Sequence, residues 1–154
     1  QRISHPFTVA FQTQLLDLKK AEKVLEIGTG SGFQTCILCK LGVRVYTIER
    51  HHDLHDKARR MLTFLNLNAR MNFGDGYKGM PSHAPFDKIL VTCGAPEIPE
   101  ELLNQLKIGG LMVIPVGEGK EQKMLRIKKI AEDDVDIEEF GTFKFVPMLE
   151  RTVK

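Results

Sequence analysis

A glycine-rich turn constrains the fold of this chain more than any other segment. The turn reads Gly28-Thr29-Gly30-Ser31-Gly32 and follows an apolar run at residues 23–27, which predicts a buried strand. Residues 33–41 then show the apolar spacing that is typical of a helix. Glycines at a strand-to-helix junction permit positive φ and let the backbone approach a ligand without a Cβ between them. The segment therefore predicts a strand, a turn and a helix, with a small-molecule cradle at the turn.

Strand-like and helix-like segments alternate along the rest of the chain. The alternation favours an α/β fold with a mostly parallel, doubly wound sheet covered by helices on both faces. Two strand-like segments near the end, separated by the turn-prone Asp133-Asp134, predict an antiparallel pair at the sheet edge. We expect strands at residues 23–27, 43–48, 69–73, 86–92, 111–116, 122–130 and 137–146 and helices at 8–18, 33–41, 51–65 and 99–106, with a Gly109-Gly110 turn before the fifth strand.

Length and charge limit the classes of protein to which the chain can belong. Its 154 residues fit one globular domain, 1–154, better than two. The formal net charge is only +2, from 22 basic and 20 acidic residues, which disfavours nucleic acid as a partner. Apolar stretches fall short of the roughly 20 residues that a membrane span needs, and no basic-then-apolar leader opens the chain. The three cysteines suggest a reducing compartment, so we expect a cytoplasmic protein. We also expect a monomer.

Spacing within the turn distinguishes among nucleotide-like ligands. The pattern is G-x-G-x-G and the next residue is Phe33, where a dinucleotide-binding turn needs a small residue to close on a pyrophosphate. Methyltransferases use the shorter pattern because their cofactor has no pyrophosphate. Glu49, at the end of the second strand, can accept hydrogen bonds from both hydroxyls of a ribose, and Asp75 can accept one from an adenine amino group. Three loops should then converge on one ligand, although a purely structural turn is the alternative.

Longer motifs run in order over nearly the whole chain. They are Ile3-Ser4-His5-Pro6, the V-L-E-I-G-T-G-S-G turn, Ile48-Glu49-Arg50, Gly74-Asp75-Gly76, Ala84-Pro85-Phe86-Asp87, Val91-Thr92, Ala95-Pro96-Glu97-Ile98-Pro99, Gln105-Leu106-Lys107, Gly109-Gly110, Ile114-Pro115-Val116-Gly117 and Phe145-Val146-Pro147. Through them the sequence resembles the protein-L-isoaspartate (D-aspartate) O-methyltransferases. The resemblance implies a Rossmann-like, S-adenosylmethionine-dependent enzyme that methylates the free α-carboxylate of L-isoaspartyl residues in damaged proteins, with D-aspartyl as a poorer substrate. The ester then collapses to a succinimide, which reopens partly to normal aspartate.

The resemblance also assigns roles to individual residues. Ser4 takes the catalytic position, as a hydrogen-bond donor that orients the reacting carboxylate, and the alternative is that it caps a helix. Thr92 either flanks the methyl-transfer site or packs at the strand end. We expect S-adenosylmethionine, and its product S-adenosylhomocysteine, to contact Glu26, Gly28, Thr29, Gly30, Ser31, Gly32, Glu49, Arg50, Gly74, Asp75, Gly76 and Thr92.

The N-terminal segment departs from the family pattern. Arg2 stands where the family usually has threonine, and His5 follows the predicted catalytic serine. The chain opens at Gln1, and family members carry an N-terminal helical segment before this point that helps to cover the substrate cleft. We therefore expect that segment to be missing and substrate affinity to be the property most affected.

Other patterns have simpler explanations than a functional site. Cys36 and Cys39 share a C-x-x-C spacing, but a second ligand pair is absent, so core or boundary thiols are the better interpretation. Histidines at 51, 52 and 55 lie among charged residues and indicate a solvated helix face, so no metal site is expected. The remaining alternatives are a methyltransferase with another substrate, a nicotinamide-dependent oxidoreductase and a non-catalytic cofactor-binding module.

Overall fold

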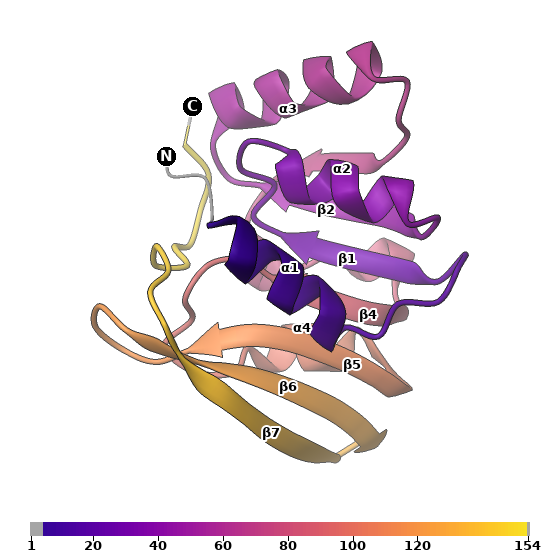
Figure 1. Cartoon of the computed structure of the whole chain (residues 1–154). Helices are drawn as coiled ribbons and strands as arrows, with labels where there is room; N and C mark the ends of the chain where they lie inside the picture. The colour runs from indigo at the N-terminus through magenta and orange to yellow at the C-terminus, as the bar shows by residue number, and fades with distance from the viewer. Residues whose placement is uncertain (1–4, 154) are drawn as a thin grey trace.

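The computed structural model describes residues 5–153, which form a seven-stranded sheet with helices on both faces (Figure 1). The strands are β1 (Lys23–Ile27), β2 (Arg44–Glu49), β3 (Arg70–Phe73), β4 (Phe86–Val91), β5 (Leu106–Val116), β6 (Gln122–Ala131) and β7 (Asp134–Phe143). They lie in the order β3-β2-β1-β4-β5-β6-β7, in which β1 to β5 pair in parallel and β6 and β7 pair antiparallel. The predicted α/β class, with an antiparallel C-terminal pair, is confirmed.

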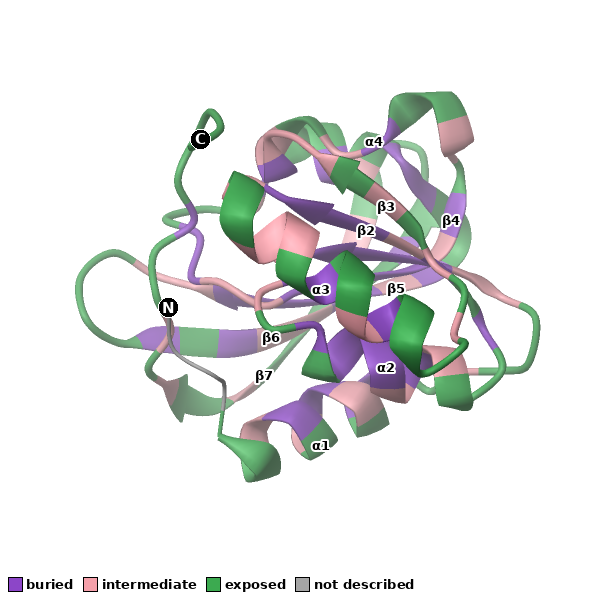
Figure 2. Cartoon of the chain, turned by 90° about the horizontal axis from the view of Figure 1, so that it is seen from above, coloured by how far each residue is buried: buried purple, intermediate pink, exposed green. Residues whose placement is uncertain are grey.

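The described part of the chain also contains four α-helices and two short 3-10 helices. The α-helices are α1 (Pro6–Leu15), α2 (Phe33–Lys40), α3 (His52–Phe64) and α4 (Glu100–Asn104), and the 3-10 helices are η1 (Gly76–Lys78) and η2 (Pro81–His83). Helices α1 and α2 cover one face of the sheet, and α4 covers the other (Figures 1 and 2). Between residues 5 and 153, no helix is both long enough and apolar enough to cross a lipid bilayer.

Strands β1 and β4 lie at the centre of the sheet and are covered from both sides. Leu90 of β4 belongs to the hydrophobic cluster that includes Leu15 of α1 and Leu38 of α2. Its neighbour Ile89 belongs to the cluster on the opposite face, together with Leu102 of α4. Consecutive strand residues point to opposite faces, so a strand buried on both faces reads as the continuous apolar run seen in the sequence.

Helix α1 begins and ends earlier than the predicted range of 8–18. Pro6 occupies its first turn, and the His5 side chain caps the helix by accepting a hydrogen bond from the Phe7 N–H at 3.1 Å. His5 therefore takes the capping role that was considered for Ser4. The helix stops after Leu15 because the chain turns at Asp17, whose φ is 49°.

Strand β5 is longer than predicted, and α4 is shorter. Leu106 pairs with Phe86, so β5 begins where the helix was expected to continue, and it runs through Gly109 and Gly110 instead of starting after them. A Cβ on Gly110 would lie 2.6 Å from the Asp87 carbonyl oxygen, so the close approach of β4 requires glycine at this position.

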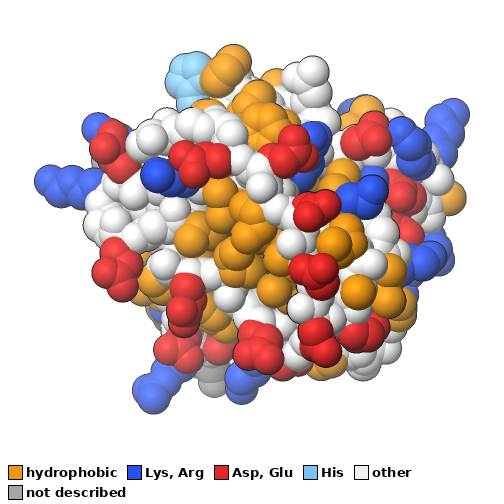
Figure 3. Space-filling view, turned by 90° about the horizontal axis from the view of Figure 1, so that it is seen from below, with side chains coloured by type: hydrophobic (Ala, Val, Ile, Leu, Met, Phe, Trp, Pro, Cys, Tyr) orange, Lys and Arg blue, Asp and Glu red, His pale blue; other side chains and the backbone are white. Residues whose placement is uncertain are grey.

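Strand β7 also differs from the prediction of 137–146. It starts at Asp134, directly after the hairpin turn, and ends at Phe143, which leaves residues 144–153 outside the strand. The face at the β7 edge carries hydrophobic side chains surrounded by acidic ones (Figure 3). A shallow cavity between α1 and β7 on this side is lined in part by Phe11, Ile137, Phe140 and Glu138.

Candidate functional site

The C-terminal ends of the parallel strands bring four predicted segments to one edge of the sheet. Gly28 follows β1, Glu49 ends β2, Gly74 follows β3 and Thr92 follows β4. The Gly28 N–H donates to the Ile48 carbonyl at 2.9 Å, and the Gly74 N–H donates to the Glu49 carbonyl at 2.9 Å. The loops that the sequence placed at successive strand ends therefore lie side by side.

The glycine turn follows a path that side chains at its two ends would obstruct. Gly28 has a φ of 94° and Gly32 a φ of 86°. A Cβ on Gly28 would lie 2.7 Å from Thr92 Oγ1. That hydroxyl lies 2.8 Å from the carbonyl oxygens of both Ile27 and Gly28, which accept its hydrogen bond. Thr92 thus fixes the start of the turn, and position 28 requires glycine because the Thr92 hydroxyl occupies the place of a side chain.

Glu49 holds the middle of the turn through its carboxylate. The side chain is buried, with an exposed fraction of 4%. Its Oε1 accepts from the Gly30 N–H at 2.8 Å, and its Oε2 accepts from the His51 N–H at 2.9 Å. Hydrogen bonds from N–H groups to a carboxylate are stronger than neutral ones, so Glu49 ties the glycine turn to the end of β2. Each carboxylate oxygen has a second lone pair, so further donors can still be accepted.

Glu26 lies beneath the turn in a fully buried position of β1. Its Oε1 accepts hydrogen bonds from the hydroxyls of Thr35 and Thr47, and Thr47 Oγ1 is also 2.7 Å from Thr29 Oγ1. Among the described residues, Glu26 Oε2 has no partner. Burial raises the pKa of Glu26 from 4.5 to about 7, against the opposing effect of the two threonine hydroxyls. Glu26 therefore supports the turn from below, where a direct cofactor contact was expected.

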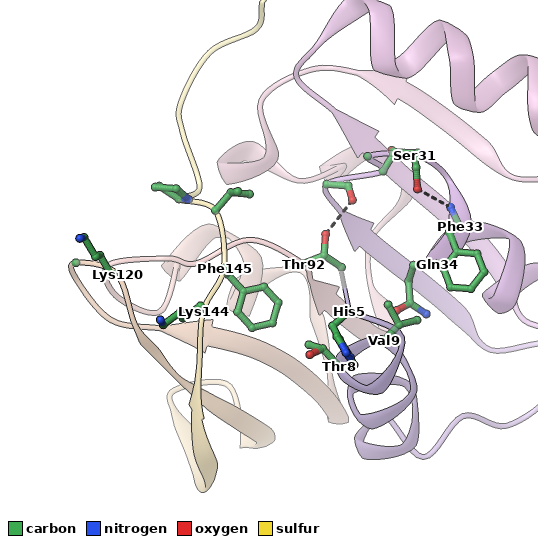
Figure 4. Close-up of a pocket in the computed structure, with 16 residues that line it drawn as sticks. His5, Thr8, Val9, Ser31, Phe33, Gln34, Thr92, Lys120, Lys144 and Phe145 are labelled. Carbon is green, nitrogen blue, oxygen red and sulfur yellow. Dashed lines mark hydrogen bonds between the residues drawn. The ribbon is translucent and has the colours of Figure 1, made fainter. Parts of the chain in front are cut away.

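A cavity of about 830 Å³ opens beside the glycine turn (Figure 4). Its walls come from α1, the glycine turn with the start of α2, the end of β4, the loop before β6 and the segment after β7. The described lining comprises His5, Thr8, Val9, Gly28, Thr29, Gly30, Ser31, Phe33, Gln34, Thr92, Gly119, Lys120, Lys144, Phe145, Val146 and Pro147. This lining includes two lysines and no Asp or Glu, so its charged part is basic.

The segment after β7 closes one side of the cavity by crossing the strand ends. The Gly94 N–H donates to the Val146 carbonyl at 2.7 Å, and the Met148 N–H donates to the Gly94 carbonyl at 2.7 Å. Further along, the His52 N–H donates to the Val153 carbonyl at 2.7 Å. The segment thus connects the end of β4 to the start of α3. Figure 4 shows Phe145 on the side of the cavity opposite Phe33 and Gln34.

Five of the predicted cofactor contacts line the cavity, and the others lie around it. Gly28, Thr29, Gly30, Ser31 and Thr92 are in the lining. Gly32 begins α2 as its N-cap residue. Ser4, the predicted catalytic residue, lies outside the described residues, but the adjacent His5 is part of the cavity wall.

Arg50, Gly74, Asp75 and Gly76 lie at the same sheet edge but outside the cavity lining. The Arg50 guanidinium donates from Nε to the Arg151 carbonyl at 3.0 Å, so it holds the C-terminal segment instead of pointing into the cavity. Asp75 Oδ1 caps η1 by accepting from the Tyr77 N–H at 2.9 Å. A Cβ on Gly76 would lie 2.5 Å from Ile27 Cγ2, so packing against β1 explains this glycine.

Several lining residues were not predicted from the sequence. Gln34 is buried, and a polar residue on the inner side of α2 directly after the turn is a signal that could have been used. Phe145 and Pro147 belong to a sequence motif, but the predicted strand at 137–146 places most of this segment in the sheet and away from a cavity wall. Lys120 comes from a loop that no local pattern connects with the site.

The cysteines and histidines outside the cavity have structural surroundings. Burial raises the pKa of the Cys39 thiol to about 11, which makes it a poor nucleophile near neutral pH. Within residues 5–153, no cluster of three or more His, Cys, Asp or Glu side chains has a metal-binding arrangement. His52 is half exposed, whereas His55 retains only 12% exposure and packs near the Phe73 ring, so the predicted solvated face is solvated only in part.

The family model and the curated proteins that match this chain carry the same description. The family model described as "Protein-L-isoaspartate(D-aspartate) O-methyltransferase" matches residues 1–153. A protein-L-isoaspartate O-methyltransferase of Christiangramia forsetii is 56% identical over 151 residues, and one of Flavobacterium psychrophilum is 57% identical over the same length. Each alignment covers 97% of this chain and 70% of the relative.

Solved structures show the same similarity at the level of the fold. A protein-L-isoaspartate O-methyltransferase structure superposes with a TM-score of 0.89 at 27% identity, covering 98% of this chain and 49% of that one. A Plasmodium falciparum protein described as an enzyme of this kind, in complex with S-adenosyl-L-homocysteine, superposes with a TM-score of 0.82 at 24% identity. That alignment covers 97% of this chain and 79% of the other.

Proposed function

Because this chain belongs to the protein-L-isoaspartate (D-aspartate) O-methyltransferase family, we propose that it transfers a methyl group from S-adenosylmethionine to the free α-carboxylate of L-isoaspartyl residues in damaged proteins, and of D-aspartyl residues less well. The methyl ester begins repair of the damaged residue. The glycine turn held between Glu49 and Thr92 is the observation that carries the proposal. Its backbone forms one wall of the cavity of about 830 Å³, where a cofactor and a substrate carboxylate can meet.

The residues at the strand ends fit the cofactor. Gly28 lets the turn pass close to Thr92, because a Cβ there would meet the Thr92 hydroxyl. Glu49 keeps acceptor capacity for ribose hydroxyls after binding the Gly30 and His51 N–H groups. Asp75 follows β3, one residue after Gly74, whose N–H bonds the Glu49 carbonyl. We infer that the adenosine part lies along these ends, from the glycine turn toward Asp75.

Substrate activation by a general base is unnecessary in this reaction. A carboxylate with an ordinary pKa near 4 is ionised at neutral pH, and the bound cofactor supplies an electrophilic sulfonium methyl group. The chain contributes position: α1, the glycine turn and the 144–147 segment form the walls between which the carboxylate is held. Correct alignment of two reactants can lower a barrier by up to about 7–11 kcal/mol. The basic lining residues Lys120 and Lys144 favour an anionic group on this side.

Ser4 completes the proposed site by analogy with the family. The resemblance assigns it to donate a hydrogen bond to the reacting carboxylate, and the neighbouring residue His5 lines the cavity. Thr92 acts indirectly, because its hydroxyl is bonded to the Ile27 and Gly28 carbonyls and so positions the turn.

The proposal includes the molecular setting of the enzyme. The seven strands form one sheet, which supports treating residues 1–154 as one methyltransferase domain. Free thiols at Cys36, Cys39 and Cys93 support a reducing compartment such as the cytoplasm. The near-neutral net charge of +2 supports protein and peptide substrates and gives no reason to expect nucleic acid. We propose that the chain acts as a monomer.

Two measurements test the proposed function together. Isothermal calorimetry with S-adenosylhomocysteine should give saturable binding, and a synthetic isoaspartyl peptide should accept a methyl group from S-adenosylmethionine. The same peptide with a normal aspartyl residue is the control and should accept none. Cofactor binding without transfer would reject the activity of this chain and retain the cradle, whereas loss of both would reject the cradle as well.

A further inference from the structure

Gln34 has a buried side-chain oxygen that is not used by the fold. Gln34 is the second residue of α2 and is 6% exposed. Its Nε2 donates to Thr13 Oγ1 at 2.9 Å, which connects α2 to α1. Its Oε1 is buried and has no hydrogen-bond partner within the described part of the chain. Buried side-chain carbonyls are normally paired, so this oxygen requires an explanation.

Hydrogen-bond donors fix which atom of the Gln34 amide faces Thr13. The Thr13 hydroxyl lies 2.7 Å from the Val9 carbonyl, four residues earlier in α1, and donates its one proton there. Toward Gln34, the Thr13 oxygen can then only accept, so it must face the amide nitrogen. Rotating the amide by half a turn would place two acceptors against each other. The unpaired acceptor therefore lies on the other side of the Gln34 side chain, away from Thr13.

Gln34 itself belongs to the wall of the candidate site. Gln34 lines the cavity together with Val9, Thr8 and His5 of the α1 wall, and Figure 4 shows its side chain beside these residues, across from Phe145. An acceptor in this wall calls for an N–H donor from whatever occupies the cavity. The donor could come from a charged ammonium group or from a neutral amide.

Electrostatics favour the neutral donor. The described lining contains Lys120 and Lys144 and no Asp or Glu, so an ammonium group of a peptide, added beside the sulfonium of the cofactor, gains no compensating charge from it. Gln34 also lies in the first turn of α2, where the helix dipole places positive partial charge. A peptide amide N–H has no such conflict. An isoaspartyl peptide carries amide N–H groups close to its free carboxylate, and the lysines suit the carboxylate.

We propose that Gln34 is a substrate-positioning residue whose Oε1 accepts a hydrogen bond from a backbone amide N–H of the isoaspartyl peptide. The inference rests on the proposed function, because it takes the peptide as the occupant of the cavity. It adds a contact in which α2, the helix that follows the cofactor turn, also holds the substrate. Cofactor cradle and substrate contact would then be fixed to each other by a single rigid element.

The test compares Gln34→Leu with the matched control Gln14→Leu, which makes the same change at an exposed position of α1. Fluorescence anisotropy of a labelled isoaspartyl peptide, with the protein saturated by S-adenosylhomocysteine, gives the peptide Kd without turnover. Gln34→Leu should raise that Kd about five- to tenfold, as expected for one neutral hydrogen bond, and Gln14→Leu should not change it. The S-adenosylhomocysteine Kd, from calorimetry, should stay the same for both variants.

Two ester-containing peptides identify the donor. One replaces the amide N–H of the isoaspartyl residue by oxygen, and the other replaces the N–H of the following residue. With the unmodified protein, one of these two ester peptides should bind about five- to tenfold more weakly than the parent peptide. With Gln34→Leu, that ester peptide and the parent peptide should bind equally well, because the acceptor is gone. Gln34→Met, which keeps the side-chain length, provides the same comparison if the leucine variant does not fold.

Several outcomes would overturn the inference. Gln34 Oε1 would have another role if Gln34→Leu left the peptide Kd unchanged. The same conclusion would follow if the ester peptides were weakened as much with the Gln34 variants as with the unmodified protein, or if the S-adenosylhomocysteine Kd rose as much as the peptide Kd. If the unmodified protein binds and methylates the isoaspartyl peptide, such a result rejects the Gln34 contact alone. If the unmodified protein does neither, the proposed function fails and the Gln34 contact fails with it.

Discussion

Replacing Gly28 by alanine should destabilise the protein through two separable effects. Alanine would have to adopt the φ of 94° found there, and a left-handed backbone costs an L-residue about 1–2 kcal/mol. Its Cβ would also lie 2.7 Å from Thr92 Oγ1, which is too close, so the hydroxyl must move and weaken its hydrogen bond to the Ile27 and Gly28 carbonyls. Such a bond contributes about 0.5–1.5 kcal/mol. The total is about 1.5–3.5 kcal/mol, or roughly 3–14 °C in Tm for a chain of this size.

Gly30→Ala provides the matched control. Gly30 has a φ of 55°, but the nearest atom to an added Cβ is the Gly28 carbonyl oxygen at 4.0 Å, so only backbone strain applies. Urea unfolding should show Gly28→Ala to be less stable than Gly30→Ala by about 1 kcal/mol. In a Thr92→Ala background the clashing atom is gone, and Gly28→Ala should then cost about 1 kcal/mol less than in the original chain. Equal effects of the two glycine substitutions, or additive effects of Gly28→Ala and Thr92→Ala, would refute the reasoning.

Three further predictions concern charged residues. Burial raises the pKa of Glu26 from 4.5 to about 7, so between these pH values the native state holds a proton that the unfolded state releases. The free energy of unfolding should therefore fall by about 3 kcal/mol as the pH rises from 4.5 to 7. Glu26→Gln should flatten this pH dependence in urea titrations, and an unchanged slope would contradict the assignment. Glu49→Gln should weaken S-adenosylhomocysteine binding about tenfold or more in calorimetry by removing a charged acceptor, whereas Glu100→Gln, on the exposed first turn of α4, should not. Lys144→Glu should raise the KM for an isoaspartyl peptide at low salt, and this increase should shrink at high salt because salt screens the charges. Lys57→Glu, at an exposed position of α3, makes the same change of charge and should leave the KM unaffected at both salt concentrations.

Local patterns predicted the parts of the fold that local interactions determine. The run from Lys23 to Ile27 with the following glycines identified β1, the turn and α2, since burial on both faces and a strand-to-helix turn leave clear traces in sequence. The extent of β5 could not be found this way. Gly109 and Gly110 resemble a turn, and only the pairing of Leu106 with Phe86 extends the strand through them.

The candidate site was predicted on its cofactor side more fully than on its substrate side. The glycine turn and Glu49 belong to strand ends, and parallel pairing is enough to bring them together. Arg50 follows the same strand, yet its side chain is directed to the Arg151 carbonyl by a segment 101 residues away. Lys120 reaches the cavity from the loop before β6, and Lys144 and Phe145 reach it from the segment after β7. No local sequence pattern encodes such contacts.

The central position of β1 has a kinetic consequence. Thr92 reaches the Ile27 and Gly28 carbonyls across 65 and 64 residues of chain, so the cradle cannot form until β4 has docked beside β1. Parallel pairing over such separations requires closure of a long loop and slows folding. A ligand that recognises the completed cradle will therefore bind only late on the folding pathway and will slow unfolding more than it accelerates folding. At one hundred times its Kd, such a ligand would add about 2.7 kcal/mol to the stability of the whole sheet.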